Sequence, residues 1–223
     1  MTRSELLQTA KPILFNTEMV RAILDESKTA TRRIAKGIYP YSEYGDFATK
    51  IKGEWQGPVS MENIVKFKSP YLPGDIRYVR ETWQRIWKTN DRDQIIEGTD
   101  KYYYKADGTP PFTYYVDPDT GEHRDIPWRP SIHMPKKAAR IFLEVTDVRV
   151  EHLQDMTLDD FLAEGVVIRP EAFNDPENAY QQAKETFTKI WNSTIKRPDI
   201  DRYGWEANPW VWAIEFERIE TNL

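Results

Sequence analysis

The sequence contains no cysteine among its 223 residues, and this absence excludes several classes of protein at once. A chain without thiols has no disulfide, no thiolate-bound zinc and no cysteine nucleophile. Only 3 histidines occur, and they are scattered. His133 is therefore interpreted as structural rather than as a metal ligand or general base, and neither a metal nor another cofactor is expected.

Long apolar runs and an excess of positive charge are also missing. No stretch approaches the roughly 20 apolar residues that a membrane span needs, and no signal peptide is evident. We therefore expect a protein of the cytoplasm, in a bacterial host cell, with no membrane partner. A net charge of −5 argues against a general polyanion binder, so that any nucleic-acid site must be a local basic patch. A glycine-rich phosphate loop is absent as well.

The chain is rich in large aromatic residues. The 8 Trp, 12 Tyr and 9 Phe compensate for a hydrophobic fraction of only 39%, so a folded core is expected. The length favours one elaborated domain over residues 1–223, with irregular insertions at about 37–70 and 88–130.

Hydrophobic periodicity predicts a mixture of helices and strands, and hence an α+β fold. The predicted helices are Thr17–Glu26, Thr157–Gly165 and Pro176–Ile195. The predicted strands are Lys28–Lys36, Ile76–Trp83, Tyr102–Tyr104, Ala139–His152 and Pro209–Ile219.

The segment Lys28–Arg33 is the first candidate site. It combines a lysine and two arginines with β-branched residues and no acid, so it is expected to present positive charge. If the strand twists, Lys28 can reach Thr31, which lies three residues later, and a lysine of depressed pKa can activate a hydroxyl nucleophile. The alternative is a solvated basic strand in which Thr31 only satisfies β-propensity.

The order of motifs resembles the ASCH domain family, whose members are PUA-like β-barrels. Four pieces carry the resemblance: Ala22–Arg33, Leu72–Trp83, Arg140–Gly165 and Trp210–Ile219. The stretches Trp128–Pro135, Tyr78–Trp83 and Asn208–Trp212 look like the phage and prophage branch of that family. The resemblance implies a twisted PUA-like barrel with flanking helices and the long irregular insertions at its rim.

The resemblance also implies chemistry. Lys28, Thr31 and Glu164 occupy the positions of the working residues in bacterial ASCH proteins that hydrolyse N4-acetylcytidine. Thr31 would then be the nucleophile, Lys28 its base and later proton donor, and Glu164 the group that orients the exocyclic nitrogen or a water. One departure stands out, since the family usually has glycine where this chain has Glu26-Ser27.

Further residues are candidates for contact with a nucleic acid or a ligand. They are Arg32, Arg33, Arg80, Glu81, Trp83, Lys136 and Lys137. Each also has a plain structural interpretation: a surface ion pair between Arg80 and Glu81, and a solvated loop for Lys136, Lys137 and nearby Arg140. Trp210 and Trp212 could stack on bases, but their alternation in a final strand favours the core.

These observations leave three functions open. The first is a metal-independent amidohydrolase that removes acyl groups from N4-acylated cytosine nucleosides. The second is a non-catalytic module that binds RNA, DNA or a modified base in the same cleft. The third, by family analogy alone, is a ribonuclease.

Overall fold

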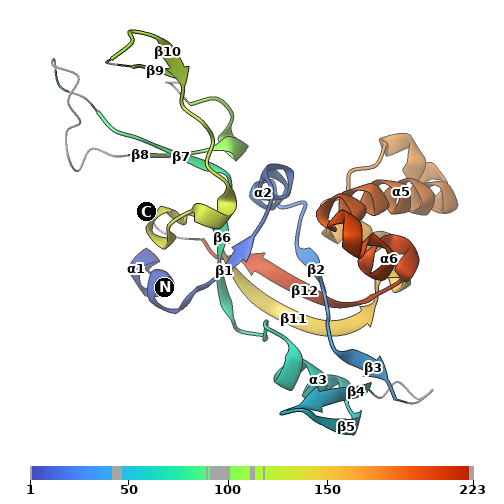
Figure 1. Cartoon of the computed structure of the whole chain (residues 1–223). Helices are drawn as coiled ribbons and strands as arrows, with labels where there is room; N and C mark the ends of the chain where they lie inside the picture. The colour runs from blue at the N-terminus through green and yellow to red at the C-terminus, as the bar shows by residue number, and fades with distance from the viewer. Residues whose placement is uncertain are drawn as a thin grey trace. The chain divides into compact units, whose positions relative to one another are not determined.

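The computed structural model describes residues 2–41, 47–88, 90, 101–110, 114–117 and 119–220, and within them the chain is a mixed α+β protein with several sheets and six α-helices (Figure 1). It divides into two compact units. The first comprises residues 1–24, 76–143 and 218–223, and the second comprises residues 25–75 and 144–217. Among the described residues, the strands of neither unit close into a barrel.

The first unit is built from short strands and two helices. Strand β1 (Lys11–Leu14) pairs in parallel with β6 (Ile76–Arg80), and helices α1 (Arg3–Thr9) and α2 (Thr17–Leu24) flank β1 in the sequence. Two antiparallel pairs follow: β7 (Trp83–Ile86) with β8 (Lys101–Tyr104), and β9 (Tyr114–Val116) with β10 (His123–Asp125). The core of this unit gathers Leu6, Tyr78, Trp83, Met134 and Phe142.

The second unit holds the longest elements. Strand β12 (Trp210–Arg218) pairs with β2 (Ala30–Ile34) and also neighbours β11 (Phe142–His152), whose first two residues belong to the first unit. Helices α4 (Leu158–Ala163), α5 (Pro176–Thr194) and α6 (Ile200–Tyr203) follow β11 in the chain. Phe161, Phe187, Trp191 and Trp205 form an aromatic core around α4 and α5.

A smaller sheet completes the second unit. Strands β3 (Ile38–Pro40), β4 (Phe47–Ile51) and β5 (Glu54–Val59) pair antiparallel in that order, and helix α3 (Met61–Lys68) follows, with Ser60 as its N-cap. Phe47, Ile64 and Val145 share a core cluster with Trp212, so the small sheet and α3 pack on the strands of this unit.

Most of the predicted elements are confirmed. Helices α2, α4 and α5 and strands β2, β11 and β12 lie within the expected ranges, and β8 begins one residue before its expected range. Asn16 caps α2 by accepting from the Met19 amide. Trp212 is buried in the core, as its alternation predicted. The strand predicted at Ile76–Trp83 instead divides into β6 and β7, because the chain changes partners at Glu81 and Thr82.

The expectation of irregular structure is wrong for the first stretch, whose described residues 37–41 and 47–70 hold β3, β4, β5 and α3. In the second stretch the short strands β9 and β10 occur in addition to the predicted β8. Short strands separated by glycine turns explain the error, since Lys52 and Gly53 at the β4–β5 turn both have positive φ, 52° and 89°. The turn predicted over 117–121 is confirmed at its described residues, where the Gly121 amide donates to the Asp117 carbonyl at 2.8 Å. Residues 111 and 118 of the predicted turns, and residues 42–46 and 91–100 of the insertions, lie outside the described residues.

No helix in the described ranges has the length and apolar character required to cross a membrane.

Candidate functional site

Backbone pairing within the second unit places Lys28 beside Glu164. The two residues form an isolated antiparallel bridge, and the Thr29 amide donates to the Ala163 carbonyl at 2.8 Å. Just before this bridge, Glu26 has a φ of 65°, the left-handed conformation that glycine adopts at least cost. Glu26 therefore adopts a backbone conformation that suits glycine.

Local sequence fixes the other side of the bridge. Thr157 caps α4, with its hydroxyl accepting from the Asp160 amide while the Asp160 carboxylate accepts from the Thr157 amide, a reciprocal capping box. The helix ends at Glu164, and Gly165 follows with a φ of 82°, so the chain turns sharply there. Glu164 is thus held at the C-terminus of a short, well-capped helix.

The Lys28 ammonium is enclosed by three acceptors. Its Nζ donates to Glu164 Oε2 at 2.6 Å, to the Glu164 carbonyl at 2.9 Å and to the Ala30 carbonyl at 2.8 Å. The Lys28 side chain has no exposed surface. Burial lowers the Lys28 pKa, while Glu164 acts in the opposite direction. Three acceptors match the three protons of an ammonium, so this environment holds Lys28 as a hydrogen-bond donor.

Arg32 joins the same cluster. Its Nε donates to Glu151 at 2.8 Å, and its Nη2 donates to Asp160 at 2.6 Å. Arg149 donates to the same two carboxylates and to Glu215. The expectation that residues 28–36 present positive charge is therefore wrong for Lys28 and Arg32, because acidic residues from β11, α4 and its end neutralise them.

One donor and one acceptor in this cluster form an ion pair but no hydrogen bond. Arg32 Nη1 and Glu164 Oε1 lie 3.6 Å apart, and within the described residues neither atom has a hydrogen-bond partner. Both residues are at least nine-tenths buried. The pair can donate to and accept from a single bridging group, such as a water or a planar amide or amidine edge.

Thr31 lies apart from this face of the strand. It sits opposite Ile214 in the pairing of β2 with β12 and is buried. Because side chains alternate along a strand, Thr31 and Arg32 point to opposite faces of β2. The structure thus brings Lys28, Arg32 and Glu164 together and directs Thr31 to the other face, while Arg33 is half-buried further along the same strand.

The remaining candidates belong to the first unit. Glu81 is buried and accepts two bonds from Arg140, at 2.9 and 3.0 Å, so the alternative of a surface ion pair between Arg80 and Glu81 is wrong. Burial raises the Glu81 pKa although Arg140 opposes the shift. Arg80 instead donates to the Met134 carbonyl at 3.1 Å and to the Ile132 carbonyl.

Three further candidates of the first unit differ in exposure. Trp83 is buried beneath Arg129, whose guanidinium lies 5.2 Å from the ring centroid, so Trp83 offers no free face for stacking. Lys136 is half-buried over the Tyr78 ring, whereas Lys137 is exposed. His133 is exposed, and the described residues contain no cluster of three or more His, Asp or Glu side chains that could hold a metal ion.

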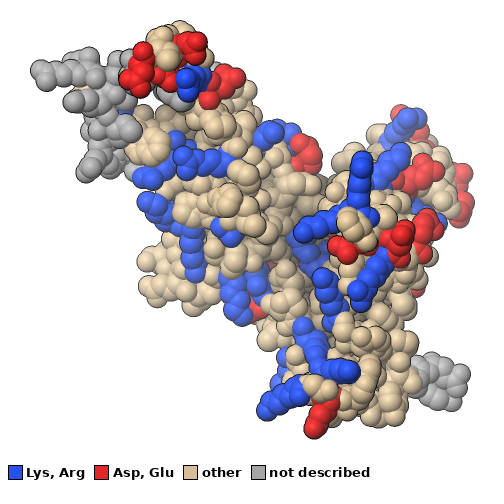
Figure 2. Space-filling view, in the orientation of Figure 1, with Lys and Arg blue, Asp and Glu red and all other residues tan. Residues whose placement is uncertain are grey.

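A surface that the sequence did not reveal lies on the small sheet. Tyr39 and Trp55 are 47% and 59% exposed, and their ring centroids are 5.1 Å apart. Lys50 Nζ lies 5.0 Å from the Trp55 ring, and Lys68 donates to the Lys50 carbonyl. We call Tyr39, Lys50, Lys52, Trp55 and Lys68 the aromatic–lysine surface. Figure 2 shows lysine and arginine side chains gathered in this region, over β4, β5 and α3.

Comparison with models of protein families, with curated proteins and with solved structures found no match to this chain.

Proposed function

We propose that this chain is a nucleic-acid-directed protein related to ASCH domains of the PUA-like class, acting in the bacterial cytoplasm, and that it binds single-stranded RNA or DNA through the aromatic–lysine surface. The observation that carries the proposal is the exposed Tyr39–Trp55 pair with Lys50 beside it. Single-stranded nucleic acid is bound by aromatic rings on which bases stack and by cations that follow the phosphates.

Charge supports the same conclusion. The chain as a whole carries a net charge of −5, yet the aromatic–lysine surface contains three lysines, with Glu54 as the adjacent exposed acid. This is the local basic patch that an acidic chain needs to attract phosphate. By contrast, the Lys28 cluster is closed by its own carboxylates, so it contributes no comparable positive surface.

The test measures binding of fluorescent single-stranded oligonucleotides at several salt concentrations. Affinity is expected to fall as salt rises, and a variant with Lys50→Ala and Lys52→Ala should bind more weakly and show a shallower salt dependence. A matched control replaces Lys101 and Lys137, two exposed lysines of the first unit, and should leave binding unchanged. Equal binding by both variants would place the nucleic-acid site elsewhere.

A second candidate function is hydrolysis of the amide in N4-acylated cytosine. The direct contact between Lys28 and Glu164 favours it, because two of the three residues implied by the resemblance meet at 2.6 Å. In this reaction β2 would have to turn the Thr31 hydroxyl from its opposite face toward the pair. Because Lys28 already donates to three acceptors, the hydroxyl would lose its proton to the Glu164 carboxylate as its oxygen attacks the acyl carbon. The cytosine nitrogen would leave with that proton, and water would then cleave the Thr31 ester to release the acid.

The hydrolysis is tested by incubating N4-acetylcytidine with the unaltered chain and following cytidine by chromatography. Turnover that persists in Thr31→Ser and disappears in Thr31→Ala would support the Thr31 role, since serine retains the hydroxyl. Turnover that is unaffected by Thr31→Ala, or no turnover at all with the unaltered chain, would exclude that role.

A further inference from the structure

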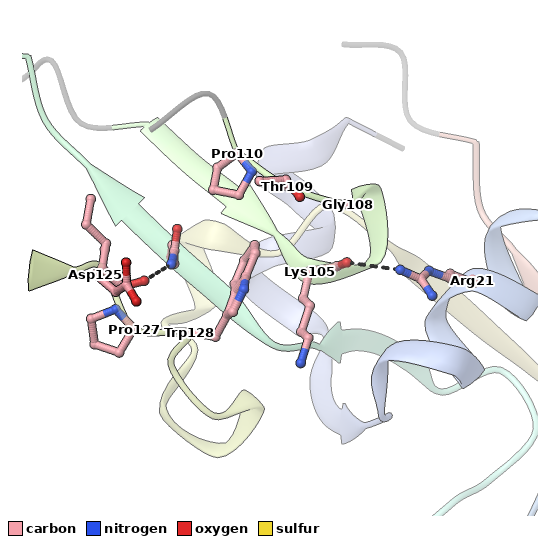
Figure 3. A pocket seen from close by; sticks show the side chains of 10 residues that line it. Arg21, Lys105, Gly108, Thr109, Pro110, Asp125, Pro127 and Trp128 are labelled. Atoms are coloured by element: carbon pink, nitrogen blue, oxygen red, sulfur yellow. Dashed lines mark hydrogen bonds between the residues drawn. The ribbon is translucent and has the colours of Figure 1, made fainter. Parts of the chain in front are cut away.

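A cavity of about 530 Å3 lies in the first unit, and its lining shares no residue with the Lys28 cluster or the aromatic–lysine surface. Its volume is in the range of small-molecule sites, roughly 300 to 1,000 Å3. The residues that line it include Arg21, Gln84, Lys105, Pro110, Asp125 and Trp128, and Figure 3 shows most of them around the opening.

Gln84 supplies the most specific polar group of this cavity. Gln84 is 2% exposed, and its Nε2 donates to the Ile126 carbonyl. This bond identifies the nitrogen end of the amide and leaves Oε1 as the other end. Within the described residues, Gln84 Oε1 has no hydrogen-bond partner. A buried acceptor without a donor is costly, so this atom favours a ligand that brings an N–H group.

The walls suit a flat ligand. In Figure 3 the Trp128 indole stands between Lys105 on one side and Asp125 and Pro127 on the other. An indole and a proline ring offer flat apolar faces against which a heteroaromatic ring can stack. The Asp125 carboxylate is a second acceptor, so the lining calls for a ring that carries more than one N–H donor.

The lining of the same cavity includes a cation, Lys105, whose backbone turn is held by hydrogen bonds. Lys105 is exposed, and it opens a short 3₁₀ turn, Lys105–Asp107, that ends at Gly108 with a φ of 99°. Arg21 secures this turn by donating to the Ala106 carbonyl at 3.0 Å and to the Lys105 carbonyl at 3.4 Å. The turn thereby places Lys105 in the lining of the cavity that Trp128 also lines.

We propose that this cavity binds a nucleotide whose base carries an exocyclic amino group. The amino group donates to Gln84 Oε1, the base lies against Trp128, and the phosphate lies beside Lys105. This inference does not rest on the function proposed above, because it uses only residues of the first unit and a free nucleotide rather than a strand.

The first experiment varies the ligand and leaves the protein intact. Calorimetry with the full chain compares AMP with IMP and CMP with UMP, since each second nucleotide has a carbonyl in place of the amino group. At least one amino-bearing nucleotide should bind roughly tenfold more tightly than its counterpart, because a carbonyl would face Gln84 Oε1 with a second acceptor. Equal binding within both pairs, or no binding at millimolar concentration, overturns the proposal.

The second experiment varies the protein. Lys105→Ala should lower the affinity for the nucleotide roughly tenfold, and it should remove most of the preference for the nucleotide over its nucleoside. Lys101→Ala is the matched control, since Lys101 is exposed in the same unit, lies over the Tyr103 ring and does not line the cavity. An unchanged preference in Lys105→Ala, or an equal loss in both variants, contradicts the proposal.

Discussion

Lys28 Nζ lies 2.6 Å from Glu164 Oε2, and the two residues are 136 positions apart in the chain. Both side chains are almost fully buried, and Lys28 also donates to the carbonyls of Ala30 and Glu164. Removal of either charge leaves the other one buried without its partner. The pair therefore bears on stability whatever chemistry it performs.

The first prediction concerns this buried pair. Lys28→Met should lower the free energy of unfolding by about 3 to 5 kcal/mol, because it removes the direct partner of the buried Glu164 carboxylate and leaves only Arg32, at 3.6 Å. Glu18→Gln, which breaks an exposed pair with Arg21, should change it by less than about 1 kcal/mol. Urea denaturation followed by circular dichroism measures both. A double variant, Lys28→Met with Glu164→Leu, should be more stable than Lys28→Met alone, and a further loss in the double variant would contradict this account.

The second prediction concerns acid. Burial raises the Asp160 pKa, but bonds from the Thr157 backbone and hydroxyl and from Arg32 outweigh it, so the pKa lies below its ordinary value. A carboxyl whose pKa is lower in the folded state contributes stability above its unfolded pKa and loses it as pH falls. Unfolding free energy should therefore decrease below about pH 4. Asp160→Asn should weaken this part of the pH dependence, and an identical pH profile in that variant would exclude Asp160 as a source.

The third prediction concerns Glu26. A non-glycine residue with a φ of 65° carries backbone strain, and glycine at this position would relieve it. Glu26→Gly should raise the free energy of unfolding by about 0.5 to 1 kcal/mol. Glu26→Ala retains the Cβ and should bring no such gain. Chemical denaturation of the two variants measures both free energies of unfolding. A higher value for Glu26→Ala than for Glu26→Gly would contradict the presence of backbone strain at this position.

The fourth prediction concerns Trp55. Base stacking on an exposed ring contributes about 1 to 3 kcal/mol per base, so Trp55→Ala should weaken binding of a single-stranded oligonucleotide about 5-fold to 150-fold. Trp128→Ala, in the first unit, should leave that binding unchanged. Fluorescence anisotropy with labelled oligonucleotides measures both variants. Weaker binding by Trp128→Ala with unchanged binding by Trp55→Ala would place the oligonucleotide site at the cavity of the first unit instead.

Several elements could be predicted because their signals are local. The cap at Thr157 with Asp160 in the first turn, the apolar stripe of α5 and the alternation of β12 are all written in neighbouring residues. The small sheet β3–β5 could not be predicted in the same way. Its strands are short, and glycine and proline interrupt each possible period, so only pairing between strands reveals them.

The candidate site, too, was predictable only where its signals are local in the sequence. Sequence by itself determined that the chain has no thiol chemistry, that a capped helix ends near Glu164 and that basic residues follow α2. Only the tertiary structure decided what those basic residues meet. The segment of Lys28 and Arg32 was expected to present positive charge because it contains no acid itself, yet β11, α4 and Glu164 bring carboxylates to them across more than 100 residues. Charge burial depends on partners distant in sequence, and no local pattern encodes it.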